Sequence, residues 1–158
     1  MASALVSLYS SRGGVGRTFL SVNLAVDLLL ETRERTLLLD LGQPVSMDAA
    51  LFLSLPQVNA IEQILPSAAR LAPAMLKSYA ASHKSGLDVL GLYSPRQAQA
   101  SPPDPSALAA LIERLFSVYG WIVADLGHGF NPMAQRLLDL SDVILIPPAP
   151  QPPSLAHA

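Results

Sequence analysis

A glycine-rich stretch near the amino terminus carries the residue types that bind phosphate. Residues 10–18 read Ser-Ser-Arg-Gly-Gly-Val-Gly-Arg-Thr and follow the short apolar run ALVSLY. Gly13, Gly14 and Gly16 permit positive φ angles and a close approach of the backbone, so several N–H groups can converge on one phosphate. A helix that begins directly after the loop adds the positive end of its dipole. The stretch therefore predicts an anion site of the phosphate-binding-loop type.

Charged and hydroxyl side chains complete this loop. In the pattern G-x-x-x-x-G-K-[ST], Gly16 and Thr18 match, whereas Ser11 replaces the first glycine and arginine replaces the lysine. Arg17 keeps the positive charge for the β- and γ-phosphates, and the Thr18 hydroxyl is a ligand type for Mg²⁺. The residues expected to hold the phosphates are Gly13, Gly14, Val15, Gly16, Arg17 and Thr18.

Two other interpretations of the glycine-rich stretch stay open. It can be only a tight turn between a strand and a helix. It also resembles the dinucleotide fingerprint G-x-G-x-x-G, for which Gly14 and Gly16 fit and Asp40 is placed to bind a ribose hydroxyl. Phe19 stands at the third glycine position of that fingerprint, where the helix must pack closely on the strand. This residue disfavours a Rossmann-type dinucleotide-binding domain.

Two aspartates end apolar runs of the kind expected for central strands. Asp40 closes RTLLLD and Asp125 closes WIVAD. The carboxyl ends of parallel strands share one sheet edge, where open α/β sheets bind ligands. Asp125 is predicted to hold the Mg²⁺ shell together with Thr18, although an aspartate there can equally cap a helix. His128 follows in the next loop, and we interpret it as a loop-ordering residue.

The elements that must position these residues alternate between apolar strands and helices. Such alternation predicts an α/β fold with a doubly wound, mostly parallel sheet and helices on both faces. The region 43–84 is helical in composition but is interrupted by prolines, and the proline-rich stretch 94–105 is expected to be a loop. Strands are predicted at 5–9, 35–42, 87–93, 121–129 and 142–148, and helices at 18–34, 105–120 and 131–140.

Composition limits the classes of function. The chain has 158 residues, of which 51% are hydrophobic, enough for one domain with a core. It has no cysteine, which excludes disulfides and thiolate chemistry, and its three scattered histidines lack metal-ligand spacing. A net charge of -2 argues against a nucleic-acid partner. We see neither a signal peptide nor a transmembrane segment, and expect a cytoplasmic protein.

Taken together, these motifs resemble those of the ParA/MinD family of dimeric ATPases. The deviant phosphate-binding loop of that family reads K-G-G-x-G-K-[ST], and Arg12 and Arg17 fall on its two lysines. The segments DAALFL, SGLDVL, DLGHGF and PPSLAHA are similar to the CpaE/TadZ proteins of pilus and secretion assembly. The resemblance implies that residues 1–158 form a single P-loop NTPase-like domain that lacks the C-terminal strands and helices of the family.

The resemblance also implies a role for each matched residue. Arg12 would reach across a homodimer to the phosphates on the partner subunit, and Arg17 would contact the β- and γ-phosphates. Asp40 would position a nearby water, while Thr18 and Asp125 would complete the Mg²⁺ shell of bound ATP or ADP. The implied partners are a second copy and pilus or secretion assembly proteins, which would bring the protein to a cell pole or to the membrane.

Departures from the family pattern predict weakened chemistry. A planar guanidinium does not fit a nest shaped for an ammonium, so the two arginines are expected to lower nucleotide affinity. The sequence Asp40-Leu41-Gly42 lacks the second carboxylate of the family's D-x-D motif, so hydrolysis is expected to be slow or absent. Gly127 also stands where the family commonly has proline. We therefore expect a degenerate pseudo-ATPase domain that acts in localisation or assembly; the alternatives are an active ATP-hydrolysing dimer switch and the Rossmann-type domain.

Overall fold

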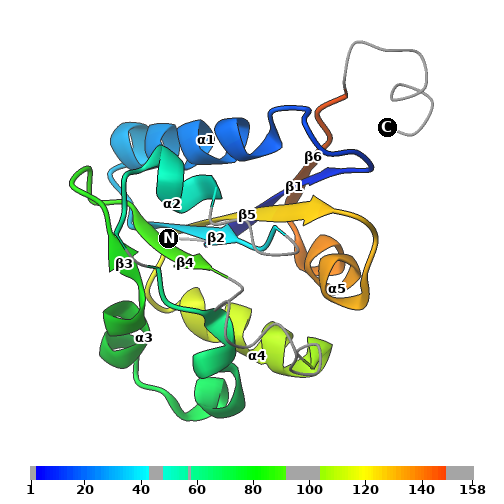
Figure 1. The fold of residues 1–158 in the computed structure, drawn as a ribbon. Helices are drawn as coiled ribbons and strands as arrows, with labels where there is room; N and C mark the ends of the chain where they lie inside the picture. The colour runs from blue at the N-terminus through cyan, green and yellow to red at the C-terminus, as the bar shows by residue number, and fades with distance from the viewer. Residues whose placement is uncertain (1–2, 43–47, 57, 92–103, 149–158) are drawn as a thin grey trace.

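A six-stranded sheet forms the centre of the computed structural model, which describes residues 3–42, 48–56, 58–91 and 104–148 (Figure 1). The strands are Ala4–Ser10 (β1), Thr36–Asp40 (β2), Ala81–Ser82 (β3), Asp88–Gly91 (β4), Trp121–His128 (β5) and Val143–Leu145 (β6). Their order in the sheet is β3-β4-β2-β5-β1-β6, and the neighbouring pairs are parallel except for β3 with β4.

Helices cover both faces of this sheet (Figure 1). The α-helices are Arg17–Thr32 (α1), Asp48–Phe52 (α2), Pro73–Tyr79 (α3), Pro105–Leu115 (α4) and Pro132–Leu140 (α5), and the 3-10 helices are Ile61–Gln63 (η1) and Leu65–Arg70 (η2). Helices α1 and α2 lie on one face, and α3, α4 and α5 lie on the other. The predicted doubly wound, mostly parallel α/β fold is therefore confirmed.

The leucines of β2 show why both faces are covered. All five residues of this strand are buried. Successive side chains of a strand point to opposite faces, so Leu37 and Leu39 pack in the core beneath α4 and α5, whereas Leu38 packs in the core beneath α1. A central parallel strand reads as a continuous apolar run for this reason.

The region 43–84 is divided into short helices, as its prolines predict. In its described part, Pro66 lies in the first turn of η2 and Pro73 begins α3. The chain then adds β3, a two-residue antiparallel strand that the sequence pattern does not reveal. The predicted loop at 94–105 lies largely outside the described residues, which resume at Asp104.

The helix starts agree better with the sequence. Asp104 caps α4 by accepting a hydrogen bond from the Ser106 N–H at 2.9 Å. Asn131 caps α5 in the same way, accepting from the Ala134 N–H at 2.8 Å. Both caps precede a proline in the first turn, as expected for the start of a helix.

The chain leaves the neighbouring strands β1 and β5 toward opposite faces of the sheet. Helix α1 follows β1 on one face, and α5 follows β5 on the other (Figure 1). Where such a switch occurs, the two connections separate and leave a crevice at the carboxyl ends of the strands. The glycine-rich loop and Asp125 both lie at this point.

The sheet ends at β6 with an apolar edge. Val143, Ile144 and Leu145 are each at least 40% exposed. A cavity of about 420 Å³ lies between this edge and α1, where Leu20 and Leu145 form part of its wall. No helix within the described ranges is long and apolar enough to cross a bilayer.

Candidate functional site

The loop between β1 and α1 is an exposed turn around open space. Gly14 and Gly16 have φ angles of 76° and 78°, in the left-handed region that glycine adopts without strain. A Cβ added at Gly13 would meet no described atom within 4 Å, and the φ angle of Gly13 is not in the left-handed region. Packing within the described part of the chain therefore does not require glycine at position 13. The close approach of an external group to the backbone would require it.

The backbone N–H groups of this loop have no hydrogen-bond acceptor among the described residues. Helix α1 has Gly16 as its N-cap with no side-chain cap, and its first backbone hydrogen bond runs from Leu20 N to Gly16 O at 2.9 Å. No N–H of residues 12–19 donates a hydrogen bond to a residue that the structure describes. Free N–H groups at the start of a helix attract anions. This cluster of donors matches the acceptor oxygens of a phosphate group.

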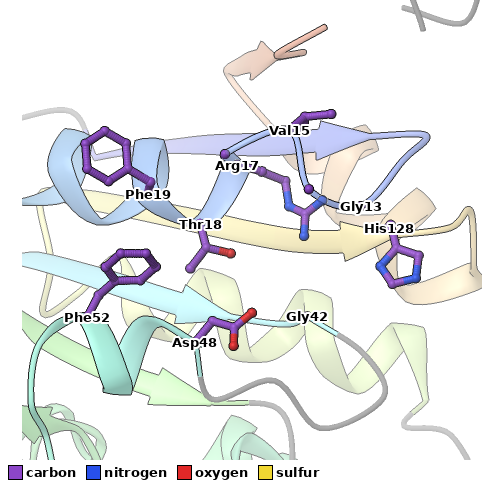
Figure 2. Close-up of a pocket in the computed structure, with 11 residues that line it drawn as sticks. Gly13, Val15, Arg17, Thr18, Phe19, Gly42, Asp48, Phe52 and His128 are labelled. Atoms are coloured by element: carbon purple, nitrogen blue, oxygen red, sulfur yellow. The ribbon is translucent and has the colours of Figure 1, made fainter. Parts of the chain in front are cut away.

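A cavity of about 350 Å³ lies beside the loop (Figure 2). This volume falls within the usual range for small-molecule sites, roughly 300–1,000 Å³. Phe19 and Phe52 stand at one end of the cavity and His128 at the other, while the Asp48 side chain lies between them, below Thr18 in the view. The lining residues are Gly13, Gly14, Val15, Gly16, Arg17, Thr18, Phe19, Gly42, Asp48, Phe52 and His128. All six loop residues predicted to bind phosphate therefore lie on its wall.

The side chain of Arg17 lines this cavity but is bound to β5. Its Nε donates to Asp125 Oδ1 in an ion pair whose side chains are 10% and 1% exposed, respectively. Its Nη1 donates to the Ser10 hydroxyl at 2.9 Å, and that hydroxyl donates to the Arg12 carbonyl at 2.6 Å. The guanidinium thus ties the glycine-rich loop to the end of β5.

Both carboxylate oxygens of Asp125 are engaged by the chain itself. The Thr18 hydroxyl donates to Oδ2 at 2.6 Å, and the Gly127 N–H donates to Oδ1 at 3.3 Å beside Arg17. Mg²⁺ requires an octahedral shell of oxygen ligands, waters included, and here a guanidinium already lies against the carboxylate. Thr18 and Asp125 lie together as the sequence predicts, but in this arrangement they do not fit a divalent cation. Nor do the described ranges contain a cluster of three or more metal-binding side chains.

Asp40 is not among the described residues that line the cavity. It is 4% exposed and accepts hydrogen bonds from the Gly42 N–H at 3.4 Å and the Ala49 N–H at 3.2 Å. Burial and the neighbouring charge of Asp125 raise the pKa of Asp40 to about 7. Through these hydrogen bonds Asp40 joins the end of β2 to the start of α2, and its role in positioning a water stays a prediction.

The raised pKa of Asp40 predicts a pH-dependent stability. Its folded pKa exceeds the ordinary value of 3.8, so the folded state binds this proton more tightly and loses stability as pH rises from about 4 to 7. The loss is at most roughly 4 kcal/mol, at about 1.4 kcal/mol per pKa unit. Asp40→Asn keeps an acceptor for the Ala49 N–H without the charge.

Urea unfolding of both proteins across this pH range tests the prediction. We expect Asp40→Asn to be the more stable protein above pH 7 and the difference to shrink toward pH 4. The exposed Asp27→Asn controls for the loss of one negative charge. Parallel stability profiles for Asp40→Asn and the unmodified chain would show that Asp40 is not a buried acid of this kind.

Several residues of the site were not singled out from sequence. Asp48 begins α2 and supplies a carboxylate to the cavity, while the Ser10 hydroxyl supports Arg17. His128, interpreted only as a loop-ordering residue, reaches the cavity wall. The sequence signal that could have identified Asp48 is an acidic residue at the start of a helix, whereas no local sequence pattern marks Ser10. Arg12 is exposed and lies outside the wall.

Gly127 has a structural reason for its identity. Its φ angle is 73°, which proline cannot adopt because its ring fixes φ near −65°. This backbone position near the end of β5 therefore excludes proline and suits glycine.

Solved structures similar to this chain include ATPases of the ParA/MinD type. A ParA family ATPase from Chlorobium tepidum matches 99% of the chain with a TM-score of 0.87 and 22% identity. The septum site-determining protein MinD from Pyrococcus horikoshii, complexed with Mg-ADP, matches 99% with a TM-score of 0.78 and 21% identity. A putative plasmid partition protein from Borrelia burgdorferi, bound to AMPPNP, matches 98% with a TM-score of 0.74 and 20% identity.

The chain spans 65%, 62% and 65% of the length of these three proteins, respectively. No protein-family model matches the sequence, and no curated protein matches it significantly. The structural likeness shows that the chain has the α/β fold of ParA/MinD P-loop NTPases.

Proposed function

We propose that this chain binds the phosphates of an adenine nucleotide, ADP or ATP, in the loop 11–18. The observation that carries the proposal is the cluster of N–H groups at residues 12–19, which have no acceptor in the described part of the chain and lie beside a cavity lined by three glycines of the loop. Two proteins of the same fold hold Mg-ADP and AMPPNP. The phosphates would lie against the loop amides and the start of α1.

Under this proposal, the chain hydrolyses ATP slowly or not at all. Arg17 is held by Asp125, and Asp40 faces backbone amides rather than the cavity. Hydrolysis needs a group that orients water, and Asp48 is the one carboxylate among the described residues of the cavity wall. Because of this position, an active ATP-hydrolysing switch is the alternative function. Release of phosphate from ATP that Asp48→Asn abolishes would establish that alternative.

The proposed role is that of a homodimeric localisation or assembly module in a pilus or secretion machine. Three apolar side chains are exposed near the cavity: Phe19 (55%), Leu51 (77%) and Phe52 (58%). Arg12 is exposed on the glycine-rich loop. Exposed apolar patches of this kind mark interaction surfaces. The resemblance to CpaE/TadZ proteins supplies the assembly role. A species that sediments as a monomer at high concentration, with and without ADP, would remove the dimer from the proposal.

Calorimetric titration with ADP, pyrophosphate, adenosine and NAD tests the binding proposal. We expect ADP and pyrophosphate to bind and adenosine to bind far more weakly, because the structure offers donors for phosphate. At about 100 times the dissociation constant, ADP should add roughly 2.7 kcal/mol to the stability of the fold. Equal affinity for adenosine and ADP would contradict phosphate recognition, and binding of NAD without ADP would favour the dinucleotide alternative.

A further inference from the structure

The buried Arg17–Asp125 pair supplies a positive charge beside the proposed phosphate site. Asp125 is fully buried, and its two oxygens accept from Arg17, Thr18 and Gly127. We infer that this loop binds a nucleoside diphosphate as the metal-free anion, and that the Arg17 guanidinium replaces the divalent cation. This inference rests on the proposed function, because it requires phosphate to enter the loop.

The guanidinium has donors left for a phosphate. It carries five N–H groups, of which the Nε–H bonds Asp125 and one N–H of Nη1 bonds Ser10. Its Nη2 donates to no residue that the structure describes, and Arg17 forms part of the cavity wall. Figure 2 shows the side chain of Arg17 reaching from α1 toward the space near Gly13. The guanidinium therefore can bind Asp125 on one side and phosphate oxygens on the other.

The Arg17–Asp125 pair also disfavours the binding of a nucleotide together with a divalent cation. A divalent cation at Thr18 and Asp125 would lie beside the guanidinium charge, and it would need the carboxylate that Arg17 holds. Freeing that carboxylate means separating a buried ion pair, which leaves charges without partners. Added Mg²⁺ also competes for the phosphates of the free nucleotide. Metal should therefore leave the affinity for ADP unchanged or lower it.

Lysine at position 17 isolates this effect. The lysine side chain places a methylene group where arginine has Nε, so Asp125 Oδ1 would lose its charged donor and keep only the Gly127 N–H. The charge of the side chain is kept. Arg17→Lys should thus release the carboxylate and make ADP binding depend on Mg²⁺. Arg70→Lys makes the same chemical change on an exposed side chain of η2, outside the cavity wall, and is the matched control.

The experiment is calorimetric titration of ADP with excess MgCl₂ or with EDTA. The unmodified chain and Arg70→Lys should bind ADP with EDTA at least as tightly as with Mg²⁺. The affinity of Arg17→Lys for ADP should be at least roughly tenfold higher with Mg²⁺ than with EDTA, a difference of about 1.4 kcal/mol in binding free energy. Circular dichroism verifies that each variant is folded.

Three other outcomes overturn the inference. If Mg²⁺ tightens binding to the unmodified chain by about tenfold or more, the inference fails while the proposed function stands. If neither condition gives binding to the unmodified chain, both fail. If Arg17→Lys binds ADP without metal dependence, Arg17 is not the substitute for the cation. Should this variant fail to fold, Mn²⁺ spectroscopy of the unmodified chain with ADP decides the question: protein-bound Mn²⁺ contradicts the inference, and Mn²⁺ bound only by ADP supports it.

Discussion

Replacing Arg17 by alanine is expected to lower the free energy of unfolding by about 3–5 kcal/mol. The change removes the only cationic partner that the described residues offer to Asp125, whose side chain is 1% exposed. The Thr18 hydroxyl and the Gly127 N–H still donate to this carboxylate, but neither carries charge. A buried carboxylate without a countercharge is costly, and urea unfolding measures the loss directly.

Two variants separate this effect from a general disturbance of the loop. Arg12→Ala removes an exposed arginine five positions earlier and should change stability by less than about 0.5 kcal/mol. Adding Asp125→Asn to Arg17→Ala removes the unpaired charge and should recover much of the loss. If Arg17→Ala is no more destabilising than Arg12→Ala, the buried pair does not contribute as described.

Gly16→Val is expected to weaken ADP binding by roughly a hundredfold or more, equivalent to about 2.7 kcal/mol. The φ angle of Gly16 is 78°, a conformation that a β-branched residue adopts only with strain of about 1–3 kcal/mol. The loop can relieve this strain only by turning away amides that converge at the start of α1. The new side chain would also project into the open space around the loop. Calorimetric titration with ADP measures the loss.

Gly86→Val is the matched control for this strain. Gly86 has a φ angle of 93° in the turn before β4, and β2 and β5 separate that strand from β1 in the sheet. The nearest described atom to its added Cβ is in Leu29, at an ordinary contact distance of 3.8 Å. Gly86→Val should lose similar stability yet keep the ADP affinity of the unmodified chain. Equal loss of binding in both variants would mean that strain anywhere in the fold, and not the loop geometry, governs binding.

The fold was predictable because its signals are local. The apolar run of β2 reflects burial on both faces of a parallel sheet, and Asp104 and Asn131 precede prolines at helix starts. The glycines of the loop likewise report a backbone requirement that does not depend on distant residues. In contrast, β3 has only two residues, too few for a periodic pattern, and its pairing with β4 depends on tertiary contacts.

The chemistry of the site was less predictable because it depends on residues that are distant in sequence. Arg17 and Asp125 are separated by 108 positions, so no spacing rule reveals that the arginine binds the carboxylate predicted to serve Mg²⁺. The hydrogen bond from Ala49 to Asp40 likewise crosses from one element to the next. Asp48, and not Asp40, is among the described residues that line the cavity. Sequence identified the residue types, and folding determined which of them face the ligand space.

Amide nuclear magnetic resonance during titration with inorganic pyrophosphate tests the central claim most directly, because it reports on the loop N–H groups themselves. The account predicts saturable shifts concentrated at residues 12–19, where no N–H has a partner among the described residues. Gly16→Val should remove these shifts, and Gly86→Val should keep them. Unchanged loop amides at saturating pyrophosphate, or shifts confined to other parts of the chain, would contradict phosphate binding by this loop.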